Sequence, residues 1–168
     1  LFKYTDMQVS YGINMVAIAD GRPQQMGLID ILAYYVNFQR EVIYKRTKFD
    51  LDAAKERQHI LQGLIIAVRN IDEVVRIIKT SDNVTTAKSR LRERFSLSDK
   101  QAQAILDMRL ARLTSLEVFK LEQELLELEK RIAELTKILS SKRMQFEIVK
   151  EEMGEILKKF KDGRKSDI

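Results

Sequence analysis

Hydrophobic residues recur every three or four positions along most of this chain, which is the spacing of amphipathic helices. Over residues 28–78 such steps connect the apolar positions with few gaps. The apolar seam narrows over residues 45–59, where most side chains are polar. A helix exposed on nearly all sides has this composition, so we expect a shaft rather than a helix laid on a globular core. Gly63 and Asn70 are candidate kinks.

The clearest heptad pattern runs from Val118 to Phe160. Apolar residues there alternate steps of three and four without a slip, and only Lys142 is polar. Such a seam predicts a coiled-coil helix that pairs with another helix. As a straight helix the segment would span roughly 60 Å at 1.5 Å per residue. Ser140 and Ser141, beside Lys142, predict a kink.

Between the two long patterns lies a short stretch with strong helix-start signals. Asn83 precedes a short apolar pattern and is a suitable N-cap. Ser98, with Gln101 three residues later, has the signature of a capping box, so a helix begins directly after Ser98. Thr114 with Glu117 repeats this signature at the start of the second long helix.

The helix after Ser98 carries apolar residues on more than one face, whereas a helix on a single core shows one apolar stripe. One face can pack on the chain's own helices. The other is then available for a partner, for which a second copy of the chain is the commonest candidate. The residues that we expect in this dimer contact are Ala102, Ile105, Leu106, Met108, Arg109, Leu110 and Leu113. The alternative is that they form the chain's own core.

The first 27 residues lack helical spacing and predict a β-hairpin. Residues 13–19 are followed by Asp20-Gly21, which supports the positive φ angles of a tight primed turn, and then by residues 22–26. Pro23 places the second strand at an edge. Because a lone two-stranded hairpin is marginally stable, it should pack on helices or belong to a larger domain.

These patterns predict a mainly α protein with a long antiparallel two-helix coiled-coil stalk, a small helical knob at its far end and a short β-hairpin near the N-terminus. The expected divisions are 1–27 for the hairpin region, 28–80 for the outgoing stalk helix, 81–115 for the knob, 116–160 for the returning stalk helix and 161–168 for a polar linker.

Composition supports this helical fold and excludes several classes of protein. The 168 residues include one Pro, six Gly, 45% hydrophobic and 33% charged residues, as in long amphipathic helices. Without Cys there are no disulfides or thiolate metal sites, and His59 has no second His with which to share a metal. No apolar run approaches the roughly 20 residues of a membrane span, so we expect a soluble cytoplasmic protein. Leu1 in place of an initiator methionine indicates a fragment of a longer chain.

The net charge of +5 comes mostly from residues 61–114, which hold 10 basic and 6 acidic side chains. The densest basic run contains Lys88, Arg90, Arg92 and Arg94. One interpretation is a solvated helix face. The other is a weak, salt-sensitive attraction for nucleic-acid phosphates, which would make the chain a nucleic-acid-binding helical module.

Two motifs carry a resemblance to a known family. The first is Tyr11-Gly-Ile-Asn-Met15, followed by Arg40, Arg46 and Thr47; the second is Gln101-Ala-Gln-Ala-Ile-Leu-Asp-Met-Arg-Leu110, followed by Leu113-Thr114. In this order they resemble the A subunit of bacterial type IIA DNA topoisomerases, DNA gyrase first and topoisomerase IV second. The resemblance covers essentially the whole chain. It identifies residues 1–27 as the end of the family's tower and the rest as its coiled-coil stalk and exit gate, or C-gate.

The resemblance implies a noncatalytic module of an ATP-dependent isomerase that changes DNA topology. Two knobs would meet across a twofold axis and close the gate through which the transported duplex leaves. It also implies a homodimer in the bacterial cytoplasm, associated with the nucleoid, whose partners are a B subunit and double-stranded DNA. The magnesium and ATP sites belong to that B subunit, so no cofactor or metal is expected in this chain.

Lys3-Tyr4-Thr5 is similar to the sequence around the family's DNA-cleaving tyrosine. That tyrosine belongs to a domain well upstream of the first motif, whereas Tyr4 precedes Gly12 by only eight positions. We therefore expect no catalytic residue here. The rival interpretation of the whole chain is a structural homodimeric coiled coil that pairs along its length and has no topoisomerase role.

Overall fold

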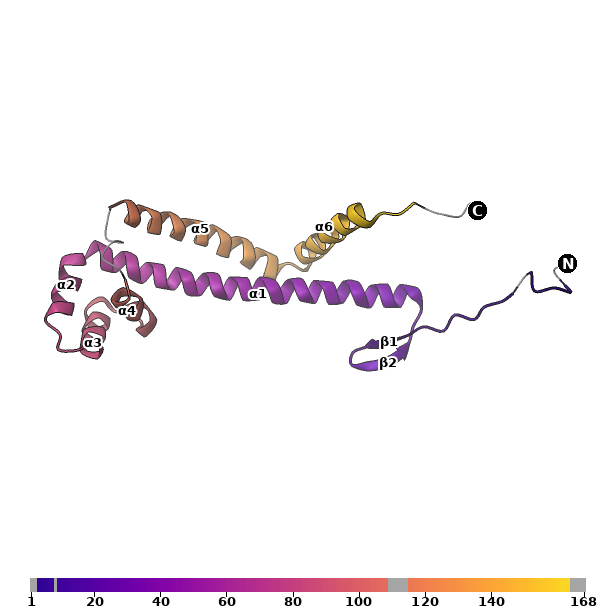
Figure 1. Cartoon of the computed structure of the whole chain (residues 1–168), viewed down its shortest axis with the longest axis horizontal. Helices are drawn as coiled ribbons and strands as arrows, with labels where there is room; N and C mark the ends of the chain where they lie inside the picture. The colour runs from indigo at the N-terminus through magenta and orange to yellow at the C-terminus, as the bar shows by residue number, and fades with distance from the viewer. Residues whose placement is uncertain (1–2, 8, 109–114, 164–168) are drawn as a thin grey trace. The chain divides into compact units, whose positions relative to one another are not determined.

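The computed structural model describes residues 3–7, 9–108 and 115–163, and these are mainly helical (Figure 1). The elements follow the order β1 (Val16–Ala19), β2 (Arg22–Gln25), α1 (Leu28–Arg69), α2 (Ile71–Lys79), α3 (Val84–Phe95), α4 (Asp99–Leu106), α5 (Ser115–Ser140) and α6 (Lys142–Phe160). The prediction of a mainly α fold with a β-hairpin near the N-terminus is confirmed. The chain divides into two compact units, the first of residues 1–43 and 145–168 and the second of residues 44–144.

The β-hairpin of the first unit has the turn that its sequence predicts. Strands β1 and β2 pair antiparallel, with Ala19 opposite Arg22. Asp20 and Gly21 between them have φ angles of 51° and 75°, both positive as a primed turn requires. Pro23 lies in β2, and since the sheet has two strands, both strands are edges.

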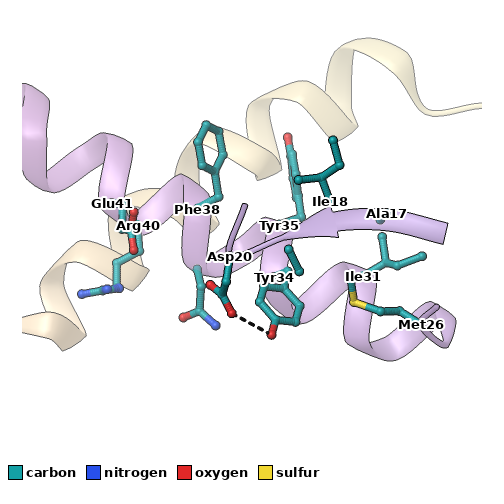
Figure 2. A pocket seen from close by; sticks show the side chains of 12 residues that line it. Ala17, Ile18, Asp20, Met26, Ile31, Tyr34, Tyr35, Phe38, Arg40 and Glu41 are labelled. Atoms are coloured by element: carbon teal, nitrogen blue, oxygen red, sulfur yellow. Dashed lines mark hydrogen bonds between the residues drawn. The ribbon is translucent and has the colours of Figure 1, made fainter. Parts of the chain in front are cut away.

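The hairpin contacts the start of α1 around a cavity of about 590 Å³. Figure 2 shows the Tyr34 hydroxyl of α1 donating a hydrogen bond to the Asp20 carboxylate, at 3.3 Å between the oxygens. The negative charge of Asp20 raises the pKa of Tyr34. Apolar and aromatic side chains of both elements, including Met26 and Phe38, line the rest of the cavity. The turn is thereby attached to the helix that follows it.

Asn70 interrupts the first long helical pattern. Its side-chain amide donates to the Ile66 carbonyl at 2.8 Å, and its backbone N–H lies 3.2 Å from the same carbonyl oxygen. A side chain that bonds the local backbone in this way competes with the regular helix. Helix α1 therefore ends at Arg69 and α2 begins at Ile71, so the chain is interrupted at Asn70, one of the two candidate kinks.

A second interruption lies at Ser141, between α5 and α6. The Ser140 hydroxyl donates to a carbonyl of its own last turn at 2.9 Å, and the Ser141 hydroxyl accepts the Met144 N–H at 3.4 Å. Both hydroxyls thus bond the backbone at the ends of the two helices. The predicted kink is confirmed, and the returning helix expected over residues 116–160 is also two helices.

The core of the second unit lies where the later part of α1 meets the following helices. Its buried apolar residues are Leu61, Leu64, Ile65, Ala67, Val74, Leu91, Leu97, Ile105 and Leu121. Within this unit α5 runs antiparallel to α1 (Figure 1). Ion pairs that join these helices include Arg57 with Glu124 at 2.7 Å and Arg69 with Glu122 at 2.8 Å.

Helix α4 lies against α1 at a position that only glycine fits. A Cβ added to Gly63 would lie 2.7 Å from both Cβ and Cγ of Gln101. Gln101 is 7% exposed, and its side-chain Nε2 donates to the His59 carbonyl at 2.7 Å. Helix α1 continues through Gly63 without a break. Gly63 is therefore a point of close contact, and its prediction as a kink is wrong.

This contact predicts opposite effects for two glycine-to-alanine substitutions. Inside an exposed helix the change stabilises by up to about 1 kcal/mol. For Gly63→Ala we expect a loss of about 1–3 kcal/mol because the added methyl group overpacks against Gln101. The matched control is Gly154→Ala in α6, where an added Cβ meets no atom within 4 Å. Urea unfolding followed by far-UV circular dichroism measures both, and stabilisation by Gly63→Ala would contradict the close contact.

Candidate functional site

The described part of the predicted knob, residues 81–108, consists of α3 and α4 with their caps. The Asn83 carboxamide oxygen accepts the Thr86 N–H at 2.8 Å, which confirms the predicted N-cap of α3. Helix α3 ends at Phe95, and its C-cap Ser96 has a left-handed φ of 53°. This turn brings Leu97, 6% exposed, into the core and leaves Ser98 to start α4.

Ser98 and Gln101 form the predicted capping box. The Ser98 hydroxyl accepts the Gln101 N–H at 3.3 Å, and Gln101 Oε1 accepts the Ser98 N–H at 2.9 Å. The same hydroxyl lies 2.7 Å from Nε2 of His59. Gln101 also donates to the His59 carbonyl and lies against Gly63. The capping box of α4 and the contact between α4 and α1 therefore form one network.

Asp99 joins α3 to α4 electrostatically. Its carboxylate accepts hydrogen bonds from Lys88 Nζ at 2.6 Å and from Arg92 Nη1 at 3.2 Å. The hydrogen bond from Lys88, with the positive charges of both partners, lowers the pKa of Asp99. The carboxylate also stands in the first turn of α4, where negative charge is favourable.

Two further ion pairs join the neighbouring helices. Glu73 of α2 accepts from Arg94 of α3 at 2.6 Å and 3.3 Å, and this hydrogen bonding lowers the pKa of Glu73. Glu56 of α1 pairs with Lys100 of α4, which lowers the pKa of Glu56 in the same way. Side chains of opposite charge thus link α2 to α3 and α1 to α4.

The basic run of α3 is occupied by intramolecular partners. Lys88 and Arg92 contact Asp99. Arg94 contacts a carboxylate of α2, and Arg90 donates to the carbonyl of the C-cap residue of α2 at 2.9 Å. These partners offset part of the local positive charge. The arrangement favours a solvated helix face over a nucleic-acid site.

Four of the seven residues predicted for the dimer contact lie in the described part of the chain, and all four are buried or partly buried. Ala102 and Ile105 are 0% and 3% exposed, so their surface is already covered by the chain itself. Leu106 and Met108 are partly buried and pack against the edge of the core. These two retain surface that a partner can contact.

The helix that carries the predicted contact is shorter than its apolar pattern suggests. Helix α4 ends at Leu106, with Asp107 as its C-cap, and Met108 is not helical. Three of the predicted contact residues, and the first residue of the second capping box, fall outside the described part of the chain: Arg109, Leu110, Leu113 and Thr114.

Sequence reasoning missed two residues on which this part of the structure depends. Gly63 carried a signal, since a glycine inside a helical pattern often marks close packing, but no pattern pointed to its neighbour. Asp99 gave a weaker signal in the sequence, since an acidic residue in the first turn of a helix is common. Its contact with Lys88 joins residues 11 positions apart, and periodicity within one helix does not reveal it.

Neither a metal-holding group of side chains nor a membrane-spanning helix is found in the described part of the chain. Across residues 3–108 and 115–163, apart from residue 8, no three His, Asp or Glu side chains are grouped to hold a metal ion. No helix in those ranges is long and apolar enough to cross a membrane. Tyr4 is 84% exposed, with Lys3 Nζ 5.7 Å from its ring centre.

The lowered carboxylate pKa values predict acid sensitivity. A carboxylate whose folded-state pKa is depressed stabilises the fold above its unfolded pKa, near 4, and this stabilisation is lost as pH falls through the folded pKa. We expect Asp99→Asn to lower the unfolding temperature at pH 7 and to converge with the unmodified chain near pH 2. The control is Asp107→Asn, whose carboxylate accepts from the neutral amide of Gln103. Thermal unfolding from pH 2 to 7 measures this, and a pH-independent difference for Asp99→Asn would contradict it.

Comparison with known proteins gives consistent matches. The family model for the A subunit of DNA gyrase/topoisomerase IV matches residues 1–154. The DNA gyrase A subunit of Leptospira biflexa is 51% identical over 168 residues, that of Clostridium acetobutylicum 48% and that of Streptococcus pneumoniae 45%. Each match covers 100% of this chain and 20% of the relative, so the chain spans about a fifth of the length of these relatives. The chain therefore belongs to the family of DNA gyrase/topoisomerase IV A subunits.

Proposed function

We propose that this chain is the exit-gate dimerisation module of a type IIA DNA topoisomerase similar to gyrase A. The observation that carries the proposal lies at the edge of the second unit's core, where Leu106 and Met108 are only partly buried. The chain's membership of the gyrase/topoisomerase IV A-subunit family supports the same function. Two copies meet through their knobs and close the route by which the transported duplex leaves. In the parent enzyme this gate opens in each ATP-dependent cycle of supercoiling or relaxation, in the bacterial cytoplasm at the nucleoid.

The packing of the knob supports a contact that is small but fixed in position. Ala102 and Ile105 hold α4 to the core from inside, while Leu106 and Met108 lie at the core's edge. The sequence adds Arg109, Leu110 and Leu113 to the proposed patch. A patch of this size buries little apolar area. Because burial stabilises by about 25 cal/mol per Å² of apolar surface, the dimer contact is weak enough to reopen.

The length of α1 supports a stalk. Its 42 residues correspond to about 63 Å of helix at 1.5 Å per residue. The polar residues in its middle suit a coiled coil exposed on most sides, with α5 and α6 as returning helices. Such a stalk separates the dimer contact from the DNA-cleaving part of the parent enzyme, and two stalks enclose a space for duplex DNA.

The module itself contributes no chemistry in this proposal. DNA cleavage belongs to a tyrosine outside this chain, and Tyr4 takes no part in it. Magnesium and ATP are bound by the B subunit. The dimer contact of this chain keeps the two subunits of the parent enzyme joined while the DNA between them is cleaved.

The first test is the solution mass of the chain by sedimentation velocity over a concentration series. Leu106→Arg places a charge in the proposed apolar patch and should convert the dimer to a folded monomer with unchanged helicity. Leu157→Arg is the matched control, because Leu157 is 63% exposed in α6, and it should remain dimeric.

Leu128→Arg tests the rival structural coiled coil that pairs along its length. Leu128 is a partly buried residue of α5 that packs against the core. A dimer that tolerates Leu106→Arg but is lost through Leu128→Arg, with helicity retained, would make the stalk the interface and overturn the exit-gate proposal.

A further inference from the structure

A short stretch of α1 within the second unit presents only basic and aromatic side chains to the surface. The residues of this basic-aromatic patch are all exposed: Tyr44, Lys45, Arg46, Lys48 and Phe49. We propose that the patch binds the phosphate backbone of double-stranded DNA, namely the duplex that passes between the stalks. This inference rests on the proposed exit-gate function and adds to it a DNA contact on the stalk helix itself.

The geometry of the helix gathers these side chains into one surface. Thr47, in the middle of the stretch, is 5% exposed and marks the buried side of α1 at this point. Residues three or four positions apart are neighbours on a helix surface, with Cβ atoms about 5–6 Å from one another. Lys45 therefore lies beside both Lys48 and Phe49, and Tyr44 lies beside Lys48. The patch is a continuous surface on the side of the helix that is exposed to solvent.

The positive charge of the patch is available to another molecule. Among the described residues, no side chain forms an ion pair or a hydrogen bond with the ammonium group of Lys45 or of Lys48. The basic run of α3 differs, because Lys88 and Arg92 there contact Asp99. An unpaired lysine that neutralises a phosphate releases its counterions, and this release supplies most of the affinity of nonspecific DNA binding. Two such lysines one turn apart suit neighbouring phosphates of one strand.

The two aromatic residues of the patch favour a nucleic acid over other anionic partners. Tyr44 and Phe49 are 41% and 74% exposed. Aromatic rings among cations are typical of nucleic-acid-binding surfaces. An anionic membrane instead takes up a helix with a separate apolar face, whereas Lys45 and Lys48 stand between the two rings around the helix. Because the bases of a duplex are stacked inside it, the rings contact sugars at the edge of a groove, which adds affinity without sequence preference.

The salt dependence of DNA binding tests the two lysines. The measurement is the fluorescence anisotropy of a labelled duplex of mixed sequence, titrated with the chain between about 50 and 200 mM salt. Lys45→Gln combined with Lys48→Gln should reduce the slope of log K against log salt by about 1 for each lysine removed. The matched control is Lys130→Gln with Lys137→Gln in α5, at exposed positions that each lie one turn from Glu134, and it should leave the slope unchanged. An equal loss of slope in both double variants would overturn the proposal.

Phe49→Ala separates the aromatic contact from the charge. It should weaken binding to the duplex by about fivefold at an unchanged salt slope, because apolar burial is lost and charge is not. Tighter binding to a single-stranded oligonucleotide, with Phe49→Ala removing that preference, would make the patch a stacking site for unpaired bases and overturn the duplex assignment.

The same samples distinguish failure of the patch from failure of the exit gate. The patch variants leave the knob unchanged, so sedimentation velocity should show the same dimer as in the unmodified chain. DNA binding that is indifferent to the Lys45 and Lys48 substitutions, in a chain that still forms a dimer through Leu106, would reject the patch and leave the exit gate in place. An unmodified chain that stays monomeric would reject the exit gate and, with it, this role of the patch.

Discussion

The close contact between Gly63 and Gln101 is the constraint on which the second unit depends. The absent Cβ of Gly63 leaves room for the Gln101 side chain, whose amide closes the cap of α4 and bonds the His59 carbonyl. A buried amide is acceptable only when its polar atoms find partners, and here both of its polar atoms do. Since these partners are the cap of α4 and one turn of α1, the contacts of Gln101 fix where α4 packs along α1.

The exposed ion pairs act on orientation more than on stability. Exposed pairs contribute about 0–1 kcal/mol each, so the links through Asp99, Glu73 and Glu56 do not hold the core together. Each instead connects a different pair of helices and fixes how they face one another. The same links offset part of the positive charge of the basic run that is conspicuous in the sequence.

Local signals predicted the local structure well, and packing between helices lay beyond them. The turn at Asp20-Gly21, the caps at Asn83 and Ser98, and the interruption at Ser141 all depend on residues within four positions of one another. An apolar pattern on two faces does not say which face turns inward, so the sequence leaves both a dimer contact and the chain's own core open for Ala102 and Ile105, which are buried within the single chain. No glycine or proline marks the end of α4 at Leu106, and the apolar pattern of the sequence continues beyond that end.

The side chains of the proposed knob contact pack on the core of the second unit. Leu106 and Met108 pack against the core that contains Ile105, and the capping box and Gly63 fix α4 on that core. In the proposed dimer these two side chains would therefore be held in position before a partner arrives, which lowers the entropy cost of ordering them on association.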